Sequence, residues 1–137
     1  MTNYTRGRQT EYEIRDSLRE CGYEAIRTAG SHSPIDILGW NDFEILFNQI
    51  KRVKFGNKFY PSPTEINRFK NLSIPSNGSK WIITRIDSGK GKKVEWTFQC
   101  IQPQIEKQLF IGQTIYDHPL MKYYESKGIK YSMITNK

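Results

Sequence analysis

Three polar side chains interrupt two apolar runs in the stretch SPIDILGWNDFEILFNQIKRVK, residues 33–54. Asp36 lies between two isoleucines in the first run, and Gln49 and Lys51 lie one residue apart in the second. Alternate residues of a strand share a face, so Gln49 and Lys51 are expected to point the same way. If the two runs pair as neighbouring strands, both side chains come together with Asp36.

These groups suit the metal-dependent hydrolysis of a phosphodiester. A metal ion polarises the phosphate and lowers the pKa of an attacking water, and magnesium prefers oxygen ligands, carboxylates above all. Asp36 is the expected central ligand, beside the backbone carbonyl of Ile50 and the amide oxygen of Gln49. Lys51 is expected to orient the water or stabilise developing negative charge. Glu11, predicted in the first turn of a helix where an ionised carboxylate is favoured, would bind the metal directly or through water.

The elements that position these residues are expected in the order helix, three strands, helix, two strands. The first helix is predicted at 10–21, with Thr10 and Glu13 as a capping box and Gly22 at its end. The strands at 23–28, 35–40 and 44–53 are expected to form an antiparallel meander. They are followed by a helix at 62–74, capped by Ser62 with Pro63 at its first position, and by strands at 80–86 and 94–101.

The C-terminal residues are predicted to form an appendage to this core. The core covers about residues 6–101 of a single domain, and the appendage covers 102–137. Asp117 is expected to cap a short helix that starts at Pro119 and ends at Gly128. Apolar and aromatic residues cluster here beyond what a small domain buries, so the appendage is expected to contact another copy of the chain or DNA.

Composition limits the class of protein. The chain has 137 residues, which suits one domain with one core, and its net charge of +7 favours nucleic acid as partner. No apolar run is long enough to span a membrane, and the N-terminus lacks the apolar region of a signal peptide. Cys21 and Cys100 are isolated, so they are expected to be reduced thiols. A cytoplasmic protein is therefore expected. The aromatic residues expected in the core are Phe69, Trp81, Trp96 and Phe98.

The pattern resembles the PD-(D/E)xK nuclease superfamily, with SPID in place of PD and QIK in place of (D/E)xK. The resemblance implies a restriction-endonuclease-like α/β (α+β) fold, an αβββαββ core whose mixed sheet is flanked by helices. The opening RGRQTEYE and LRECGYEAIRTAGSHSPIDI resembles archaeal-type Holliday junction resolvases, with a helix glutamate, G-aromatic-x-A-x-R, and AGS before the aspartate. It implies functional roles for Glu11, Ser31, Asp36 and Lys51.

Two departures from the superfamily pattern affect the site. Ile35 separates Pro34 from Asp36, and Gln49 occupies the position of an acid. Glutamine offers a ligand oxygen but no charge. Metal affinity is therefore expected to fall, or the site to depend on one metal ion instead of two.

The resemblance and its departures leave three functions open. Glu11, Asp36, Gln49 and Lys51 together also resemble the site of cyanobacterial intron-encoded homing endonucleases of this fold, which implies a long DNA target, a tetramer and double-strand cleavage. The first expectation is such a magnesium-dependent enzyme, a symmetric dimer or tetramer on double-stranded DNA. The alternative is a Holliday junction resolvase, which reads four-way shape. The third is a catalytically weak DNA-binding module, which the glutamine keeps open.

Basic residues around the predicted site are expected to contact DNA. Lysines and aromatic residues follow the third strand directly, and lysines separated by glycines occupy the turn DSGKGKK. Ser31 and His32 lie next to the site, where His32 is expected to reach a phosphate and not a metal. The full set expected to bind DNA is Arg6, Arg8, Ser31, His32, Lys54, Lys58, Tyr60, Lys90, Lys92 and Lys93.

Overall fold

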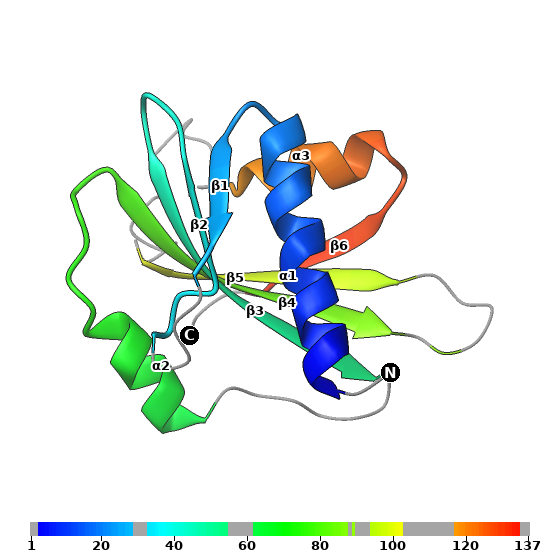
Figure 1. The fold of residues 1–137 in the computed structure, drawn as a ribbon, viewed down its shortest axis with the longest axis horizontal. Helices are drawn as coiled ribbons and strands as arrows, with labels where there is room; N and C mark the ends of the chain where they lie inside the picture. The colour runs from blue at the N-terminus through cyan, green and yellow to red at the C-terminus, as the bar shows by residue number, and fades with distance from the viewer. Residues whose placement is uncertain are drawn as a thin grey trace.

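A computed structural model of the 137-residue chain describes residues 3–28, 33–54, 62–87, 89, 94–102 and 117–134. Its helices and strands follow one another in the predicted order, including the short helix from Pro119, with one further strand at the C-terminus (Figure 1). They are α1 (Asn3–Glu20), β1 (Glu24–Arg27), β2 (Ile37–Trp40), β3 (Ile45–Lys54), α2 (Pro63–Lys70), β4 (Gly78–Asp87), β5 (Glu95–Gln102), α3 (Pro119–Ser126) and β6 (Lys130–Ile134).

The six strands form one mixed sheet in the order β1-β2-β3-β4-β5-β6. Strands β1, β2 and β3 are antiparallel neighbours, as predicted, while β3 pairs in parallel with β4. Helix α2 lies in the connection that a parallel pair requires. The mixed sheet flanked by helices confirms the predicted fold class.

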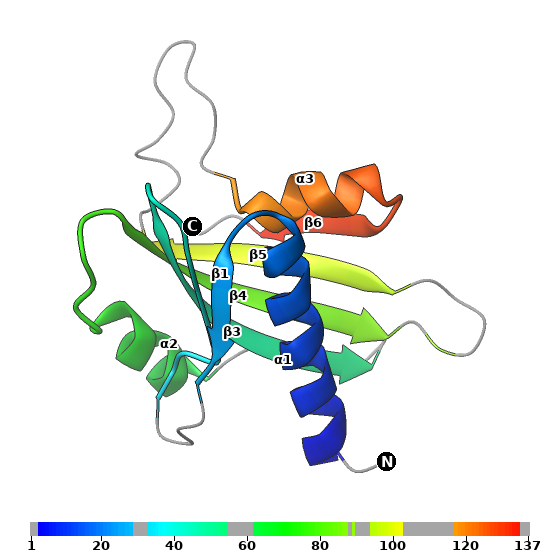
Figure 2. The same cartoon turned by 45° about the horizontal axis from the view of Figure 1, so that its top comes forward.

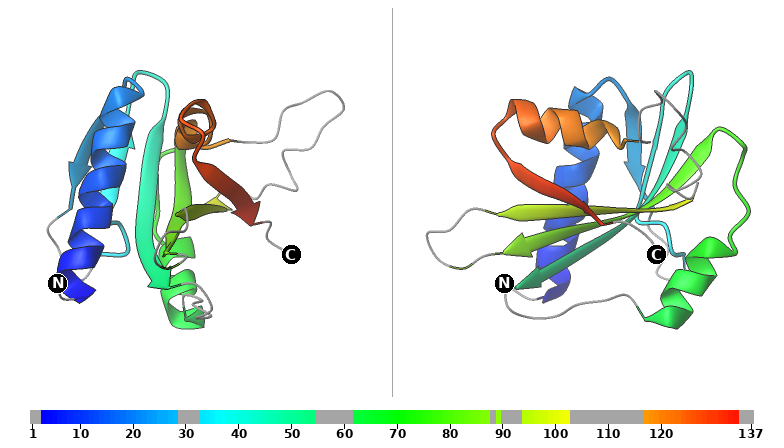
Figure 3. Two further views of the ribbon diagram at one scale, coloured as in Figure 1. Left: turned by 90° about the vertical axis from the view of Figure 1, so that its right-hand side faces the viewer. Right: turned by 180° about the vertical axis from the view of Figure 1, so that it is seen from behind.

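The helices cover opposite faces of the sheet. Ile14 of α1 and Leu120 of α3 are buried in one cluster with alternate residues of β3, β4 and β5. Phe69 of α2 is buried in a second cluster with Ile82 and Ile101 on the other face. Figures 2 and 3 show α3 beside the C-terminal end of α1 and α2 apart from both. The four aromatic residues expected in the core are all buried.

Helix α1 begins earlier than predicted. It starts at Asn3 and not at residue 10, so the capping box of Thr10 and Glu13 is wrong. Thr10 is fully buried within the helix, where its hydroxyl donates to the Arg6 carbonyl at 2.9 Å, a contact that satisfies it without a cap. Glu11 consequently lies in the middle of α1, and the helix N-terminus does not stabilise its charge. The predicted end is correct, because Gly22 follows the helix with φ of 89°.

The C-terminal segment is more closely joined to the core than predicted. Leu120, Met121 and Tyr124 are buried in the main cluster, whereas Ile134 stays 44% exposed, so the domain encloses part of this apolar group. β6 extends the sheet in parallel with β5 and was not predicted. The inward-facing Tyr131 and Met133 alternate with exposed residues, a strand signal that the prediction did not use.

Helix α3 starts at Pro119 and is followed by Gly128 with φ of 71°, as predicted. Its N-cap is His118 and not Asp117. The His118 Nδ1 accepts from the Leu120 N–H at 3.2 Å, while Nε2 lies 2.9 Å from Oδ1 of Asn48. A buried histidine therefore joins α3 to β3, the strand that carries Gln49 and Lys51.

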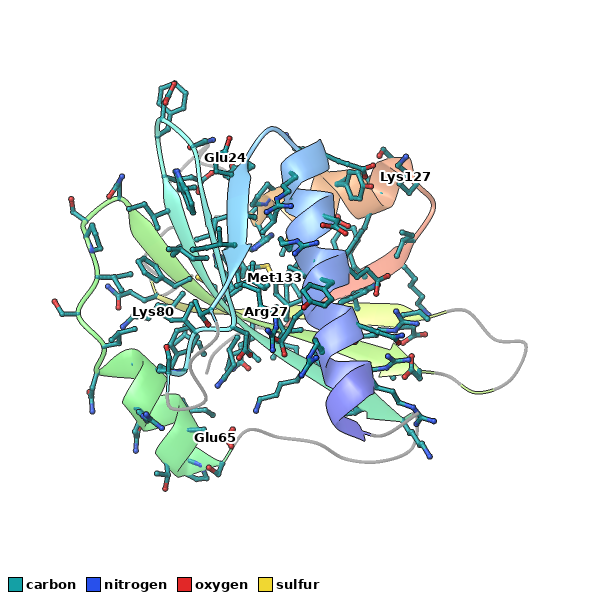
Figure 4. All side chains as sticks on the ribbon, viewed as in Figure 1. Glu24, Arg27, Glu65, Lys80, Lys127 and Met133 are labelled. Atoms are coloured by element: carbon teal, nitrogen blue, oxygen red, sulfur yellow. The ribbon has the colours of Figure 1, made fainter. Side chains whose placement is uncertain are left out.

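Helix α2 is fixed at both ends. Ser62 is its N-cap, and its hydroxyl accepts from the Glu65 N–H at 3.2 Å, with Pro63 in the first turn as predicted. The helix ends at Lys70 and not at residue 74, because the buried Lys80 of β4 takes up the free carbonyls. The Lys80 Nζ donates to the carbonyls of Lys70, at 2.9 Å, and Leu72 (Figure 4). These contacts set the position of α2 against the sheet.

Two further expectations concern the described residues. Cys21 and Cys100 are both free thiols, as predicted. No helix in the described ranges is long and apolar enough to cross a membrane.

Candidate active site

Asp36 lies just before β2 and is held by hydrogen bonds of both its backbone and its side chain. Its N–H donates to the Asn48 carbonyl at 2.8 Å, and its carbonyl accepts from the Thr28 N–H at 2.9 Å. Its Oδ2 accepts from the Ile50 N–H at 2.8 Å. The extra residue Ile35 therefore does not displace the aspartate from β3, and it packs on the α2 face of the sheet.

The surroundings of Asp36 strongly affect its protonation. Burial raises the pKa of its carboxyl to about 6, and the negative charge of Glu11 adds to the rise. The Ile50 N–H and the charges of Lys51 and Arg27 lower the pKa by smaller amounts. Glu11 and Lys51, predicted to join Asp36, thus lie close enough to act on its charge. A bound cation would favour the ionised carboxylate.

Glu11 forms an ion pair that the sequence did not predict. Its Oε1 accepts from the Arg27 Nε at 2.9 Å, which joins the middle of α1 to the end of β1 (Figure 4). Both side chains are mostly buried, with 17% and 25% of their surface exposed. Arg27 was visible in the sequence as the arginine of the motif G-aromatic-x-A-x-R, although that motif gives it no role of its own.

Gln49 and Lys51 share the face of β3 that looks towards α2, as strand alternation predicts. Gln49 is 7% exposed, and among the described residues its Oε1 has no hydrogen-bond partner. Lys51 forms an ion pair in which its Nζ lies 3.2 Å from Oε2 of Glu65. Glu65 comes from the first turn of α2 and was not among the predicted site residues, because nothing local in the sequence connects it with Lys51.

Strand geometry directs the Ile50 carbonyl to the side of β3 on which Asp36 lies. The side chain of Ile50 is buried in the main cluster. Its N–H points towards Asp36, and the N–H and C=O of one residue in an antiparallel pair point to the same side. The backbone oxygen predicted as a ligand is therefore directed to the same side of β3 as Asp36.

The oxygen atoms predicted as ligands are of the kind that a hard divalent cation prefers. Asp36 and Glu11 offer carboxylates and Ile50 offers a carbonyl, while the Oε1 of Gln49 is buried without a hydrogen-bond partner in the part of the chain that the structure describes. Among the described residues, no three His, Cys, Asp or Glu side chains form a metal-binding group.

The predicted DNA-binding residues are only partly described. Arg6 and Arg8 lie on α1 before Glu11, and Lys54 is exposed at the end of β3. The Arg6 carbonyl accepts from the Arg52 guanidinium at 3.2 Å, which fixes this part of α1 to β3. The remaining predicted residues, Ser31, His32, Lys58, Tyr60, Lys90, Lys92 and Lys93, lie outside the described residues.

The order of elements and the grouping of Asp36, Lys51 and Glu11 define the class of PD-(D/E)xK nucleases. The family model described as archaeal Holliday junction resolvase (Hjc) matches residues 2–118, and the chain belongs to this family. The fold resembles the structure of Archaeoglobus fulgidus Hjc, a Holliday junction resolvase, with a TM-score of 0.55. At 22% identity, that match covers 70% of this chain and 78% of the other. A comparison with curated proteins finds no match.

Family membership establishes part of the predicted function. The chain is an endodeoxyribonuclease of a DNA-binding family whose members generally depend on a divalent metal. The predicted resemblance to resolvases is confirmed, whereas the resemblance to homing endonucleases is not. Of the functions expected from the sequence, the comparisons favour the resolvase over the homing enzyme.

Proposed function

We propose that this protein is a magnesium-dependent Holliday junction resolvase. The match of the resolvase family model over residues 2–118 supports this choice among nucleases. The hydrogen bond of 2.8 Å between Asp36 and the Ile50 N–H supports the site, because it holds a carboxylate against the strand that carries Lys51. The net charge of +7 suits a substrate in which four DNA arms meet.

Each residue of the proposed site has a defined part. Asp36, Glu11, the Ile50 carbonyl and the Gln49 amide oxygen would hold the magnesium ion. When bound, the ion supplies Lewis-acid polarisation of the phosphate and a water of lowered pKa. Lys51 places its ammonium where negative charge develops on the phosphate. Arg27 holds the Glu11 carboxylate in place through their ion pair.

The proposal includes a symmetric dimer acting on double-stranded arms. Resolution of a junction requires paired cuts, and two copies related by a two-fold axis supply two equivalent sites. The C-terminal appendage remains the proposed place of contact, since β6 is the last strand of the sheet and Ile134 is 44% exposed. Light scattering across protein concentrations measures whether the mass corresponds to one, two or four chains.

One cleavage experiment tests the activity. Labelled four-way junctions and linear duplexes of the same sequence are incubated with the protein in magnesium, in EDTA, and with Asp36→Asn in place of the wild type. If the protein is a resolvase, the wild type cuts opposed strands of the junction in magnesium and not in EDTA, Asp36→Asn cuts nothing, and the duplexes stay intact. Cleavage of one linear sequence would instead identify a homing enzyme. Binding without cleavage of either DNA would identify a DNA-binding module.

A further inference from the structure

Lys51 is held by a carboxylate from outside the predicted site. The Oε2 of Glu65 lies 3.2 Å from the Lys51 Nζ, with 45% and 21% of the two side chains exposed. The Glu65 N–H donates to Ser62, so the backbone of this glutamate is fixed in the first turn of α2 (Figure 4). Lys80 secures the other end of the helix through the Lys70 carbonyl. The fold therefore directs Glu65 towards Lys51.

The groups around Asp36 lack the net negative charge that a divalent cation needs, and Glu65 adds negative charge beside them. Among the residues that the structure describes, Asp36 and Glu11 are negative, and Lys51 and Arg27 are the cations that act on Asp36. The charges of these four groups cancel, whereas a divalent cation requires a surplus of negative charge. An acid at position 49 would supply that surplus, but the residue there is glutamine. Glu65 adds one negative charge directly at Lys51.

The state of Gln49 independently indicates a ligand. Its side chain is 7% exposed, on the same face of β3 as Lys51, and no residue that the structure describes gives its buried Oε1 a hydrogen bond. An unsatisfied buried oxygen costs free energy unless it finds a donor or a cation. A neutral amide oxygen is a weak ligand for a hard cation, so its use at this site depends on charge supplied from elsewhere.

We propose that Glu65 is a positioning residue of the active site, which orients Lys51 and supplies the negative charge that Gln49 lacks. This rests on the proposed function of the site. The competing explanation is an ordinary ion pair between β3 and α2, and partly exposed pairs of that kind contribute little. The two explanations make different predictions for a variant in which a carboxylate at position 49 replaces the one at position 65. Only the first predicts that magnesium binding is retained.

The test exchanges the carboxylate between the two positions. Magnesium binding to the DNA-free protein is measured by calorimetry for wild type, Glu65→Gln, Gln49→Glu and the double variant. Glu65→Gln is expected to weaken magnesium binding about tenfold. Adding Gln49→Glu is expected to restore the affinity, because it returns one negative charge to the site. The junction cleavage rate and its pH profile should follow the same order.

A matched control removes an equivalent charge elsewhere. Glu95 forms an ion pair of 2.9 Å with Lys130 between β5 and β6, and Glu95→Gln is expected to leave magnesium affinity unchanged. Wild-type affinity in Glu65→Gln, or a weakening that Gln49→Glu does not restore, overturns the proposal. Asp36→Asn tests the proposed nuclease site separately from the role of Glu65. If it abolishes cleavage while Glu65→Gln has no effect, the function stands and only the role of Glu65 is wrong.

Discussion

The Asp36 carboxylate accepts a hydrogen bond of 2.8 Å from the backbone N–H of Ile50, which ties the segment before β2 to the middle of β3. The side chain of Ile50 is buried in the main cluster, so only its backbone is available to Asp36. The hydrogen bond fixes the carboxylate beside β3. Asp36 therefore serves both the fold and the proposed chemistry.

Replacing Asp36 by alanine is expected to abolish cleavage and retain DNA binding. The change removes a proposed metal ligand and leaves the basic surface intact. Cleavage assays and gel shifts on four-way junctions measure the two properties separately. Normal turnover by the variant would show that the catalytic site lies elsewhere.

Asp36→Asn is expected to raise stability near neutral pH. The folded pKa of Asp36, about 6, exceeds the ordinary value of 3.8, so ionisation of this group destabilises the folded state. The protonated Asp36 carboxyl supports the folded state fully below pH 3.8, and this support is lost as the pH rises through 6. Without metal at pH 8, the variant should be more stable by about 2 kcal/mol, a difference that vanishes near pH 4.

Denaturant unfolding in EDTA at several pH values measures this difference. The exposed Asp42 in the β2–β3 turn offers a matched control, because Asp42→Asn removes the same charge away from the site. Equal stability of wild type and Asp36→Asn at pH 8 would contradict the predicted effect of burial on this carboxyl group.

Lys51→Ala is expected to lower turnover about a hundredfold, because the variant lacks one group that stabilises charge in the transition state. DNA affinity should change much less. Lys54, exposed at the end of the same strand, provides the contrast, because Lys54→Ala should weaken binding and leave single-turnover rates nearly unchanged. If Lys51→Ala weakens binding alone, Lys51 holds a phosphate and has no part in the chemical step.

His118→Ala is expected to destabilise the fold by about 3 kcal/mol, since it removes the cap of α3 and the hydrogen bond with Asn48. Burial lowers the pKa of His118 to about 3, so its contribution is complete above pH 6.5 and falls as the pH drops below that value. The deficit should therefore shrink on acidification. Leu120→Ala, at a buried neighbour, should show a deficit that does not follow this change with pH.

Three lysines of the turn DSGKGKK are expected to contact phosphates. Changing Lys90, Lys92 and Lys93 to glutamine should reduce the slope of log affinity against log salt by up to about 3, near one unit for each phosphate that the variant no longer neutralises. Binding titrations between low and moderate salt provide the slope. A slope equal to that of the wild type would place this turn away from DNA.

Strand periodicity in the sequence predicted one feature of the proposed site. Side-chain direction in a strand repeats every two residues, so the alternation along β3 predicted that Gln49 and Lys51 share a face. The element order and the ends of α1 and α3 at Gly22 and Gly128 followed from similarly local signals. Local signals failed at the start of α1, where Thr10 satisfies its hydroxyl inside the helix.

Only the tertiary structure decided which charged groups complete the site. Arg27 reaches Glu11 from another element, and Glu65 reaches Lys51 because α2 is fixed against the sheet. These contacts depend on how the helices pack against the sheet, and that packing cannot be predicted from residue spacing or residue type in one segment. Burial likewise raises the pKa of Asp36 and leaves Gln49 without a partner. Residue types therefore identified the chemistry, while packing determined the charge balance and protonation on which it depends.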